Sequence, residues 1–270
     1  MIKIFDLIEK AKKEGYNEAN AEAKACQDII LSLIAKSHFN GNITVKGGVV
    51  MRSISGNSRR ATQDIDLDFI RYPLNDNAII SFVERLNSVG EVSIKIIGHI
   101  EELKQQDYHG KRINIEITDN ENISLKTKID LGVHKKLDII QEEYCFDLGM
   151  DDEGVSLLIN SKEQMLTEKL RSILKFGSFS TRYKDVFDIC YLSELVDPQK
   201  LKICFEYYIY SDEGMKENSL DDVIKRVEKT FSNKNYIKNL KGSKKNWLDK
   251  NFSEVINSIT DFLRKLNNSI

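Results

Sequence analysis

Acidic residues alternate with apolar ones over residues 64–70, which read Asp-Ile-Asp-Leu-Asp-Phe-Ile. Such alternation is typical of a β-strand with one polar face, and residues two apart on a strand point to the same side. The carboxylates of Asp64 and Asp66 therefore converge, which is unfavourable unless a cation joins them. Oxygen ligands of this kind suit Mg²⁺, which binds through carboxylates together with substrate phosphates. The pair alone is equally compatible with a strand face that meets solvent.

Two further features accompany this strand. Gly47 and Gly48 lie between a short apolar strand, 43–45, and a helical stretch, 49–55, and their backbone N–H groups could be aimed at a phosphate. Asp130 stands between apolar residues on a second alternating strand, 124–133. Each feature alone is weak, because glycine pairs are common in turns and a lone acid is common on an exposed strand face.

The elements that must position these residues follow from periodicity. Up to about residue 160, helices predicted over 3–13, 18–36 and 76–88 mix with strands over 92–100, 111–118 and 124–133, and residues 119–122 form a hairpin loop. Beyond it the pattern is helical, over 164–175, 181–195, 199–211, 219–231 and 251–267. We expect an α+β protein with a mixed domain over residues 1–160 and a helical domain over residues 161–270.

Composition narrows the class of protein. The 270 residues include 40 Lys and Arg against 42 Asp and Glu, and 41% are hydrophobic, as in a globular protein. No stretch approaches the ~20 apolar residues that span a bilayer, and the amphipathic N-terminus is unlike a secretory signal. We therefore expect a cytoplasmic protein without a membrane partner. Widely spaced cysteines and scattered histidines argue against a zinc site, a disulfide framework and a His-centred hydrolase.

Taken together, the strand–Gly-Gly–helix unit, the acid pair and the third acid resemble the polymerase-beta-like nucleotidyltransferases. The resemblance implies a nucleotidyltransferase domain, with a mixed sheet flanked by helices, followed by a helical C-terminal domain that completes the active site. In that chemistry two metal ions hold the attacking and leaving oxygens, and the three carboxylates would bind them. Asp130 is also placed to accept the proton of an attacking hydroxyl.

Four ordered motifs resemble the AbiEii-type toxins (AbiEii/AbiGii and MenT-like) of abortive-infection and toxin–antitoxin systems. The first is Lys-Gly-Gly-Val-Val-Met-Arg at 46–52, and the second is Arg-Ala-Thr-Gln-Asp-Ile-Asp at 60–66. The third is Glu-Lys at 168–169, within a predicted helix, and the fourth is Arg-Tyr-Lys-Asp-Val-Phe-Asp at 182–188. For each motif taken singly, ordinary surface charge is the competing interpretation; their order favours the family.

The resemblance implies roles for these residues. Asp64, Asp66 and Asp130 would bind Mg²⁺, and Lys169 would neutralise the triphosphate of an NTP substrate. Either Asp185 or Asp188 would orient Lys169 or the base, and we favour Asp188. The residues expected at the nucleotide are Lys46, Gly47, Gly48, Arg52, Ser53, Arg60, Thr62, Lys169 and Asp185. Arg60 and Thr62 could instead fix the loop that presents Asp64. We expect Asp66→Ala and Lys169→Ala to abolish activity with the fold intact.

The acceptor is less defined by sequence. Residues 223–250 contain nine basic and two acidic residues, with Tyr236 and Trp247 between them, a composition that suits RNA. The resemblance implies transfer to the tRNA 3′ end, which would block translation, and an antitoxin encoded nearby that need not form a stable complex. Transfer to a protein or a small molecule stays open, as does a silent nucleotide-binding or partner-binding module. An antitoxin-docking face is the alternative use of the basic segment. The RNA-binding residues that we expect are Lys238, Lys241, Lys244 and Lys245.

Overall fold

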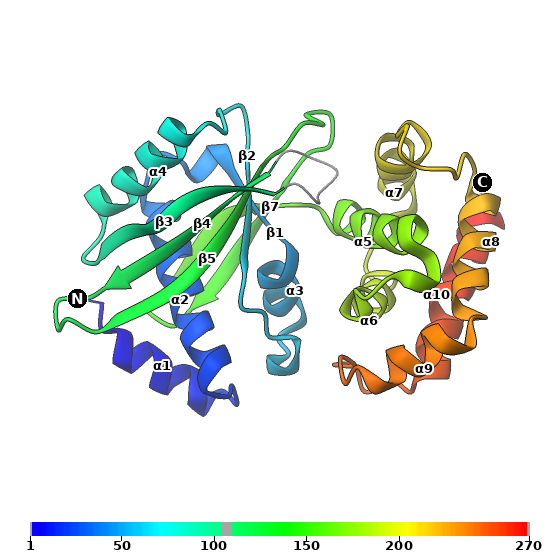
Figure 1. Cartoon of the computed structure of the whole chain (residues 1–270), viewed down its shortest axis with the longest axis horizontal. Helices are drawn as coiled ribbons and strands as arrows, with labels where there is room; N and C mark the ends of the chain where they lie inside the picture. Colours follow the sequence, from blue (N-terminus) through cyan, green and yellow to red (C-terminus); the bar gives the residue numbers. More distant parts are fainter. Residues whose placement is uncertain (1, 104–109, 269–270) are drawn as a thin grey trace. The chain divides into compact units, whose positions relative to one another are not determined.

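The computed structural model describes residues 2–103 and 110–268. The chain divides into two compact units, residues 1–160 and residues 161–270. A mixed sheet forms the centre of the first unit, and the second unit is helical (Figure 1). The predicted α+β class, with helices following a mixed sheet, is confirmed.

Seven strands form one sheet in the order β3-β4-β5-β2-β1-β7-β6. The central strand β2 pairs in parallel with β5 and antiparallel with β1, and β1 pairs in parallel with β7. The remaining neighbours are antiparallel. The strands are β1 (Ile43–Lys46), β2 (Ile65–Phe69), β3 (Ser93–Leu103), β4 (Gly110–Thr118), β5 (Ser124–Val133), β6 (Glu142–Leu148) and β7 (Asp151–Ile159).

The alternation of β2 sorts its side chains between the two faces of the sheet. Ile65, Leu67 and Phe69 are fully buried, and the Phe69 ring meets Phe82 of helix α4. Helix α2 packs on α4 and on strands β5 and β7 of the same sheet. The acids of β2 consequently lie on the opposite face. The helices of this unit are α1 (Ile4–Lys13), α2 (Glu18–Lys36), α3 (Gly47–Ser55) and α4 (Asp76–Val89).

The second unit consists of packed helices. Helix α5 packs on α6 and α7, and α10 packs on α6 and α8. Ser161 caps α5 by accepting the backbone N–H of Gln164. The helices are α5 (Lys162–Phe176), α6 (Tyr183–Leu192), α7 (Pro198–Phe205), α8 (Leu220–Phe231), α9 (Lys234–Gly242) and α10 (Phe252–Asn268), and a π-helical turn, Glu206–Tyr210, continues α7.

Three elements were not predicted from the sequence. Strands β6 and β7 form an antiparallel hairpin in which polar and apolar residues alternate only weakly. Strand β7 also pairs in parallel with β1, a contact that no local sequence pattern encodes. Helix α9 is nine residues long and strongly charged, so its apolar stripe is short. The predicted helix over 181–195 ends at Leu192.

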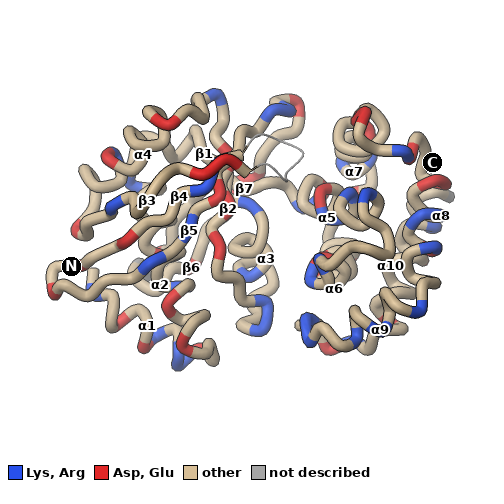
Figure 2. Tube along the Cα trace, in the orientation of Figure 1, with Lys and Arg blue, Asp and Glu red and all other residues tan. Residues whose placement is uncertain are grey.

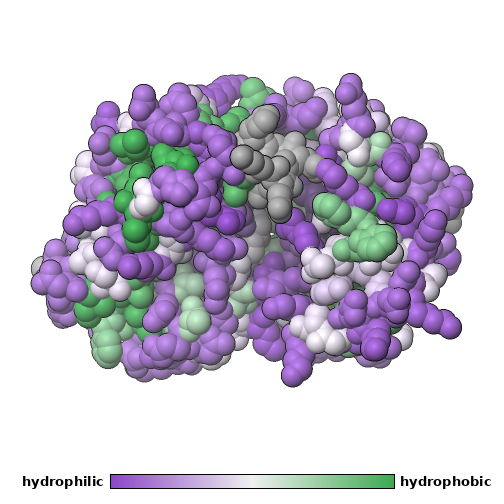
Figure 3. Space-filling view, in the orientation of Figure 1, coloured by the Kyte–Doolittle hydropathy of each residue, from purple (hydrophilic) through white to green (hydrophobic). Residues whose placement is uncertain are grey.

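Two further observations concern the cysteines and the apolarity of the helices. The four cysteines carry free thiols, and Cys26, Cys190 and Cys204 are buried. Among the described residues, no helix is both long enough and apolar enough to cross a bilayer. The face drawn in Figure 3 is mostly hydrophilic, with apolar side chains gathered in small patches.

Candidate active site

A row of charged residues crosses four neighbouring strands on the polar face of the sheet. Lys46 of β1 is in register with Asp66 of β2, Asp66 with Asp130 of β5, and Asp130 with Arg112 of β4. Two carboxylates therefore stand side by side, with one cation on each flank. Asp64 precedes the same strand by one residue. The structure thus brings Asp66 and Asp130 to paired positions on β2 and β5, with Asp64 one residue before β2.

Helix α3 begins at Gly47, next to Asp66. The backbone of Gly47 has a φ of +67°, and a Cβ placed there would lie 2.2 Å from Oδ2 of Asp66. Only glycine accepts both conditions. Lys46 provides no side-chain cap for this helix, so the first N–H groups of α3 can bind an anion. The glycine turn therefore places the start of a helix beside the carboxylates.

Gly48 fixes the loop that leads to the acids. A Cβ at Gly48 would lie 2.5 Å from Oγ1 of Thr62, and the Thr62 carbonyl accepts a 2.9 Å hydrogen bond from Nε2 of Gln27. The buried Arg60 begins the same loop. Of the two roles considered for Arg60 and Thr62, these contacts favour holding the loop over touching nucleotide.

Arg52 points into the protein. It is buried, its Nη1 donates to Oε1 of Gln27, and its Nη2 lies 3.7 Å from Oδ1 of Asp28 on helix α2. This placement favours a structural role for Arg52 over the predicted contact with a triphosphate. Ser53, on the same helix, is half-buried.

Asp66 has more acidic than basic neighbours on the polar face. Burial raises the pKa of Asp66 to about 6; the nearby Lys46 opposes this rise, while Asp130, Asp64 and Asp68 reinforce it. Lys46 forms its ion pair with Asp68, with Nζ 2.7 Å from Oδ1, and both side chains are buried. Asp66 thus lies among carboxylates, in the surroundings that a divalent cation would stabilise.

Basic side chains contact the other two acids. Nζ of Lys128 lies 3.0 Å from Oδ1 of Asp64, and Arg112 donates to both oxygens of Asp130, at 2.6 and 2.8 Å. Among the described residues, no three acidic, His or Cys side chains are gathered closely enough to hold a metal ion. The donor types and the register fit Mg²⁺, and binding of the ion requires these two acids to exchange their basic partners for it.

The second unit contains a buried ionic cluster at motifs three and four. Nζ of Lys169 on α5 lies 2.7 Å from Oδ2 of Asp188 and 3.1 Å from Oδ1 of Asp185. Asp185 also pairs with Arg182 at 2.9 Å, and Asp188 accepts a 3.0 Å hydrogen bond from Nε1 of Trp247. Asp188 is fully buried, and both candidate acids contact Lys169.

This burial changes the expected result of Lys169→Ala. The substitution leaves two buried carboxylates without their shared cation, so we expect the free energy of unfolding to fall by about 3 kcal/mol. We therefore expect Lys169→Ala to lower the stability of the fold as well as the activity. Urea denaturation measures the change, with Lys175→Ala on the exposed side of the same helix as the control. Equal stability of the two variants would contradict the ionic cluster.

The aromatic residues of the basic segment are not stacking platforms. Tyr236 and Trp247 are almost fully buried, so they do not offer the aromatic platforms that the composition of the segment suggests. The lysines of α9 and the turn after it are exposed, and Figure 2 marks the basic positions along α9. Within the described part of the chain, no acidic side chain pairs with any of these lysines. These are Lys234, Lys238, Lys241, Lys244 and Lys245.

Sequence reasoning missed the basic partners of the acids. Arg112 and Lys128 contact Asp130 and Asp64, and Gln27 links Arg52 to the Thr62 carbonyl. Lys128 carried a signal, because it lies two residues before Asp130 on an alternating strand. The position of Arg112 could have been inferred from the predicted hairpin loop over 119–122. That loop fixes the register of β4 on β5, and the register pairs Arg112 with Asp130.

The acid pair at the start of a central strand, the third acid on its parallel neighbour and the glycine turn at a helix start lie together in the first unit. A sequence model described as "Nucleotidyl transferase AbiEii toxin, Type IV TA system" matches residues 29–263, and the chain belongs to this family. It is a nucleotidyltransferase toxin of the type IV toxin–antitoxin class, which implies an antitoxin partner, and the resemblance seen in the motifs is confirmed.

Two other comparisons were made. No similar sequence was found among curated proteins. Among solved structures, an antigenic nucleotidyltransferase-like protein from Paracoccidioides brasiliensis is similar, with a TM-score of 0.47 and 14% sequence identity. The similarity covers 79% of this chain and 91% of that protein.

Proposed function

We propose that this chain transfers a nucleoside monophosphate from an NTP to the 3′ end of a tRNA, with Mg²⁺ as cofactor, and thereby blocks translation. The observation that carries the proposal is the row formed by Lys46, Asp66, Asp130 and Arg112, with the start of helix α3 beside it. Such a row combines acids that can bind metal with donors that can bind phosphate.

The triphosphate is proposed to lie at the start of α3. The first N–H groups of a helix carry partial positive charge and suit phosphate oxygens. Gly47 and Gly48 have no side chains to obstruct such an approach. Thr62 packs against Gly48 and leads to Asp64, so the anion-binding turn and the acids form one rigid piece.

Asp64, Asp66 and Asp130 would hold Mg²⁺. The ion supplies positive charge to the transferring phosphoryl group and to the oxygens that enter and leave. The protein contributes the register that sets Asp66 beside Asp130. Asp130 is the proposed acceptor of the hydroxyl proton.

Lys169 is proposed to contribute its charge to the reaction. Asp185 and Asp188 fix the Lys169 ammonium from two sides and thereby act as positioning residues.

The exposed lysines at 238, 241, 244 and 245 support RNA as the acceptor. Because each lysine that contacts a phosphate releases counterions, replacing all four by alanine should weaken tRNA binding and make its salt dependence shallower by about 3 in the log–log slope. Fluorescence anisotropy at several salt concentrations measures this slope. The control replaces four exposed lysines of the first unit, Lys13, Lys36, Lys95 and Lys135. An unchanged slope in the α9 variant would place RNA contact elsewhere.

The test of the proposal is transfer of label from an α-labelled NTP to total tRNA. We expect label on tRNA with Mg²⁺, none after chelation with EDTA, and recovery when Mg²⁺ is returned. Label on protein or on a small hydroxyl compound in place of tRNA would keep the reaction class and change the acceptor. NTP binding without any transfer would favour a silent binding module.

A further inference from the structure

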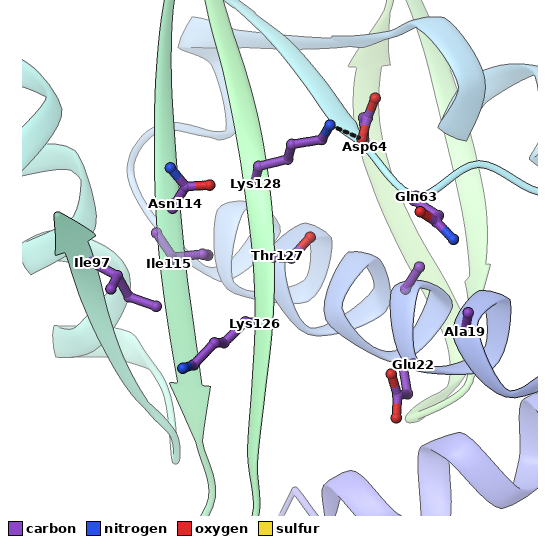
Figure 4. Close-up of a pocket in the computed structure, with 11 residues that line it drawn as sticks. Ala19, Glu22, Gln63, Asp64, Ile97, Asn114, Ile115, Lys126, Thr127 and Lys128 are labelled. Atoms are coloured by element: carbon purple, nitrogen blue, oxygen red, sulfur yellow. Dashed lines mark ion pairs between the residues drawn. The ribbon is translucent and has the colours of Figure 1, made fainter. Parts of the chain in front are cut away.

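A cleft of about 570 Å³ opens beside Asp64. It forms because β2 begins at Ile65 and pairs with β5 only from Ile129 onward, so the first residues of β5 have no neighbour on that side. Helix α2 lies behind this part of the sheet, and Ala19 and Glu22 of its first turns line the cleft (Figure 4). The volume lies within the range of about 300–1,000 Å³ that is usual for ligand pockets.

The lining combines basic, acidic and apolar side chains, with Lys126 and Lys128 opposed by Glu22 and Asp64. Ile97 lies in the same row as Asn114 and Lys128, on the polar face of the sheet, and its half-buried side chain can take the flat face of a ring. The amide of Asn114 can hydrogen-bond a base edge. Lys128 extends from β5 toward Asp64 (Figure 4), and Lys126 is the most exposed cation of the rim, with 71% of its side chain exposed. A nucleotide, with its ring and its phosphate, matches this combination of surfaces.

The order of the strands indicates whether the cleft suits the NTP donor or the acceptor nucleotide. Helix α3 follows β1, on one flank of the acids, and the cleft lies along β5, on the other flank. In an in-line displacement, the attacking and leaving oxygens lie on opposite sides of the phosphorus. If the leaving pyrophosphate lies at α3, the attacking hydroxyl comes from the β5 side.

We propose that this cleft holds the 3′-terminal nucleotide of the RNA acceptor, with Lys126 and Lys128 at its phosphate. The inference rests on the proposed function and adds to it the place where the acceptor binds. The 3′ oxygen forms a bond to the α-phosphorus, and the bond from that phosphorus to the oxygen bridging the β-phosphate breaks. Pyrophosphate leaves, and the hydroxyl proton passes to Asp130.

Two variants of the full chain test the cleft. Ala19→Trp fills its mouth from an exposed helix position, and Lys126→Glu reverses the charge at its rim. Each should raise the KM for total tRNA by ~10-fold, while the Kd for NTP measured by calorimetry stays within about twofold of the wild-type value. The matched controls are Glu18→Trp on the same turn of α2 and Lys95→Glu on β3, in the same row of side chains as Lys126. Neither control residue lines the cleft.

The outcomes separate this inference from the proposed function. If the wild type labels tRNA and both cleft variants keep its KM for tRNA, the acceptor does not bind in the cleft. If the variants lose NTP affinity and keep the KM for tRNA, the cleft holds the donor and the inference is overturned. If the wild type labels no RNA, the proposed function fails and the inference fails with it.

Discussion

We expect Asp66→Asn to reduce nucleotidyl transfer by roughly 10³-fold and to leave the fold intact. The amide keeps the volume of the carboxylate and removes its charge, so the site loses an anionic oxygen at its centre. Loss of several kcal/mol of transition-state stabilisation corresponds to a rate change of this size. Stability should be equal or slightly higher, because the substitution removes one charge from a crowded group of carboxylates. Initial rates with α-labelled NTP, together with thermal melting, measure both effects.

The matched control is Asp147→Asn, an exposed acid on the edge strand β6. It should leave the transfer rate within about twofold of wild type, since surface substitutions away from a site have small effects. Activity of Asp66→Asn within tenfold of the wild-type rate would mean that this carboxylate is not required for the reaction.

Gly47→Ala is expected to damage stability and activity together. Any L-residue is strained at a φ of +67°, at a cost of about 1 kcal/mol. The new methyl group would also lie 2.2 Å from Oδ2 of Asp66, a distance that real contacts do not show. Either Asp66 turns away or the start of α3 moves. We therefore expect a loss of transfer of roughly 10²-fold or more, because a displacement of this size misaligns reacting groups.

Gly56→Ala separates the two effects. Gly56 ends α3 with a φ of +59°, and a Cβ there would meet no atom within 4 Å. Both variants carry the cost of a left-handed backbone, and only Gly47→Ala disturbs Asp66. Urea denaturation should show a similar backbone cost, and transfer assays should show a loss for Gly47→Ala alone. Equal activity of the two variants would contradict the close approach of Gly47 to Asp66.

Local patterns predicted the pieces of the site that are local in the chain. The alternation over 64–70 predicted β2 and the face that carries its acids, because the apolar partners Ile65, Leu67 and Phe69 must be buried. The glycine pair after an apolar strand predicted a turn and then a helix over 49–55, and the helix begins two residues earlier, at Gly47.

Local sequence patterns could not predict contacts between segments that are distant in the chain. The parallel pairing that sets Asp66 beside Asp130 joins strands more than sixty residues apart, and no turn chemistry encodes its register. The buried role of Trp247 depends on Asp188, fifty-nine residues earlier in the chain. From composition alone, an aromatic residue among lysines has the same pattern whether it packs in a core or meets a nucleic acid.

The most direct test of the account compares an NTP labelled at the α-phosphate with the same NTP labelled at the γ-phosphate, each incubated with the full chain, Mg²⁺ and total tRNA. Nucleotidyl transfer places the α label on RNA and releases the γ label in pyrophosphate. We expect this result for the wild type and neither product for Asp66→Asn. A γ label on RNA would show phosphate transfer instead, and would contradict the role assigned to the row of acids beside helix α3.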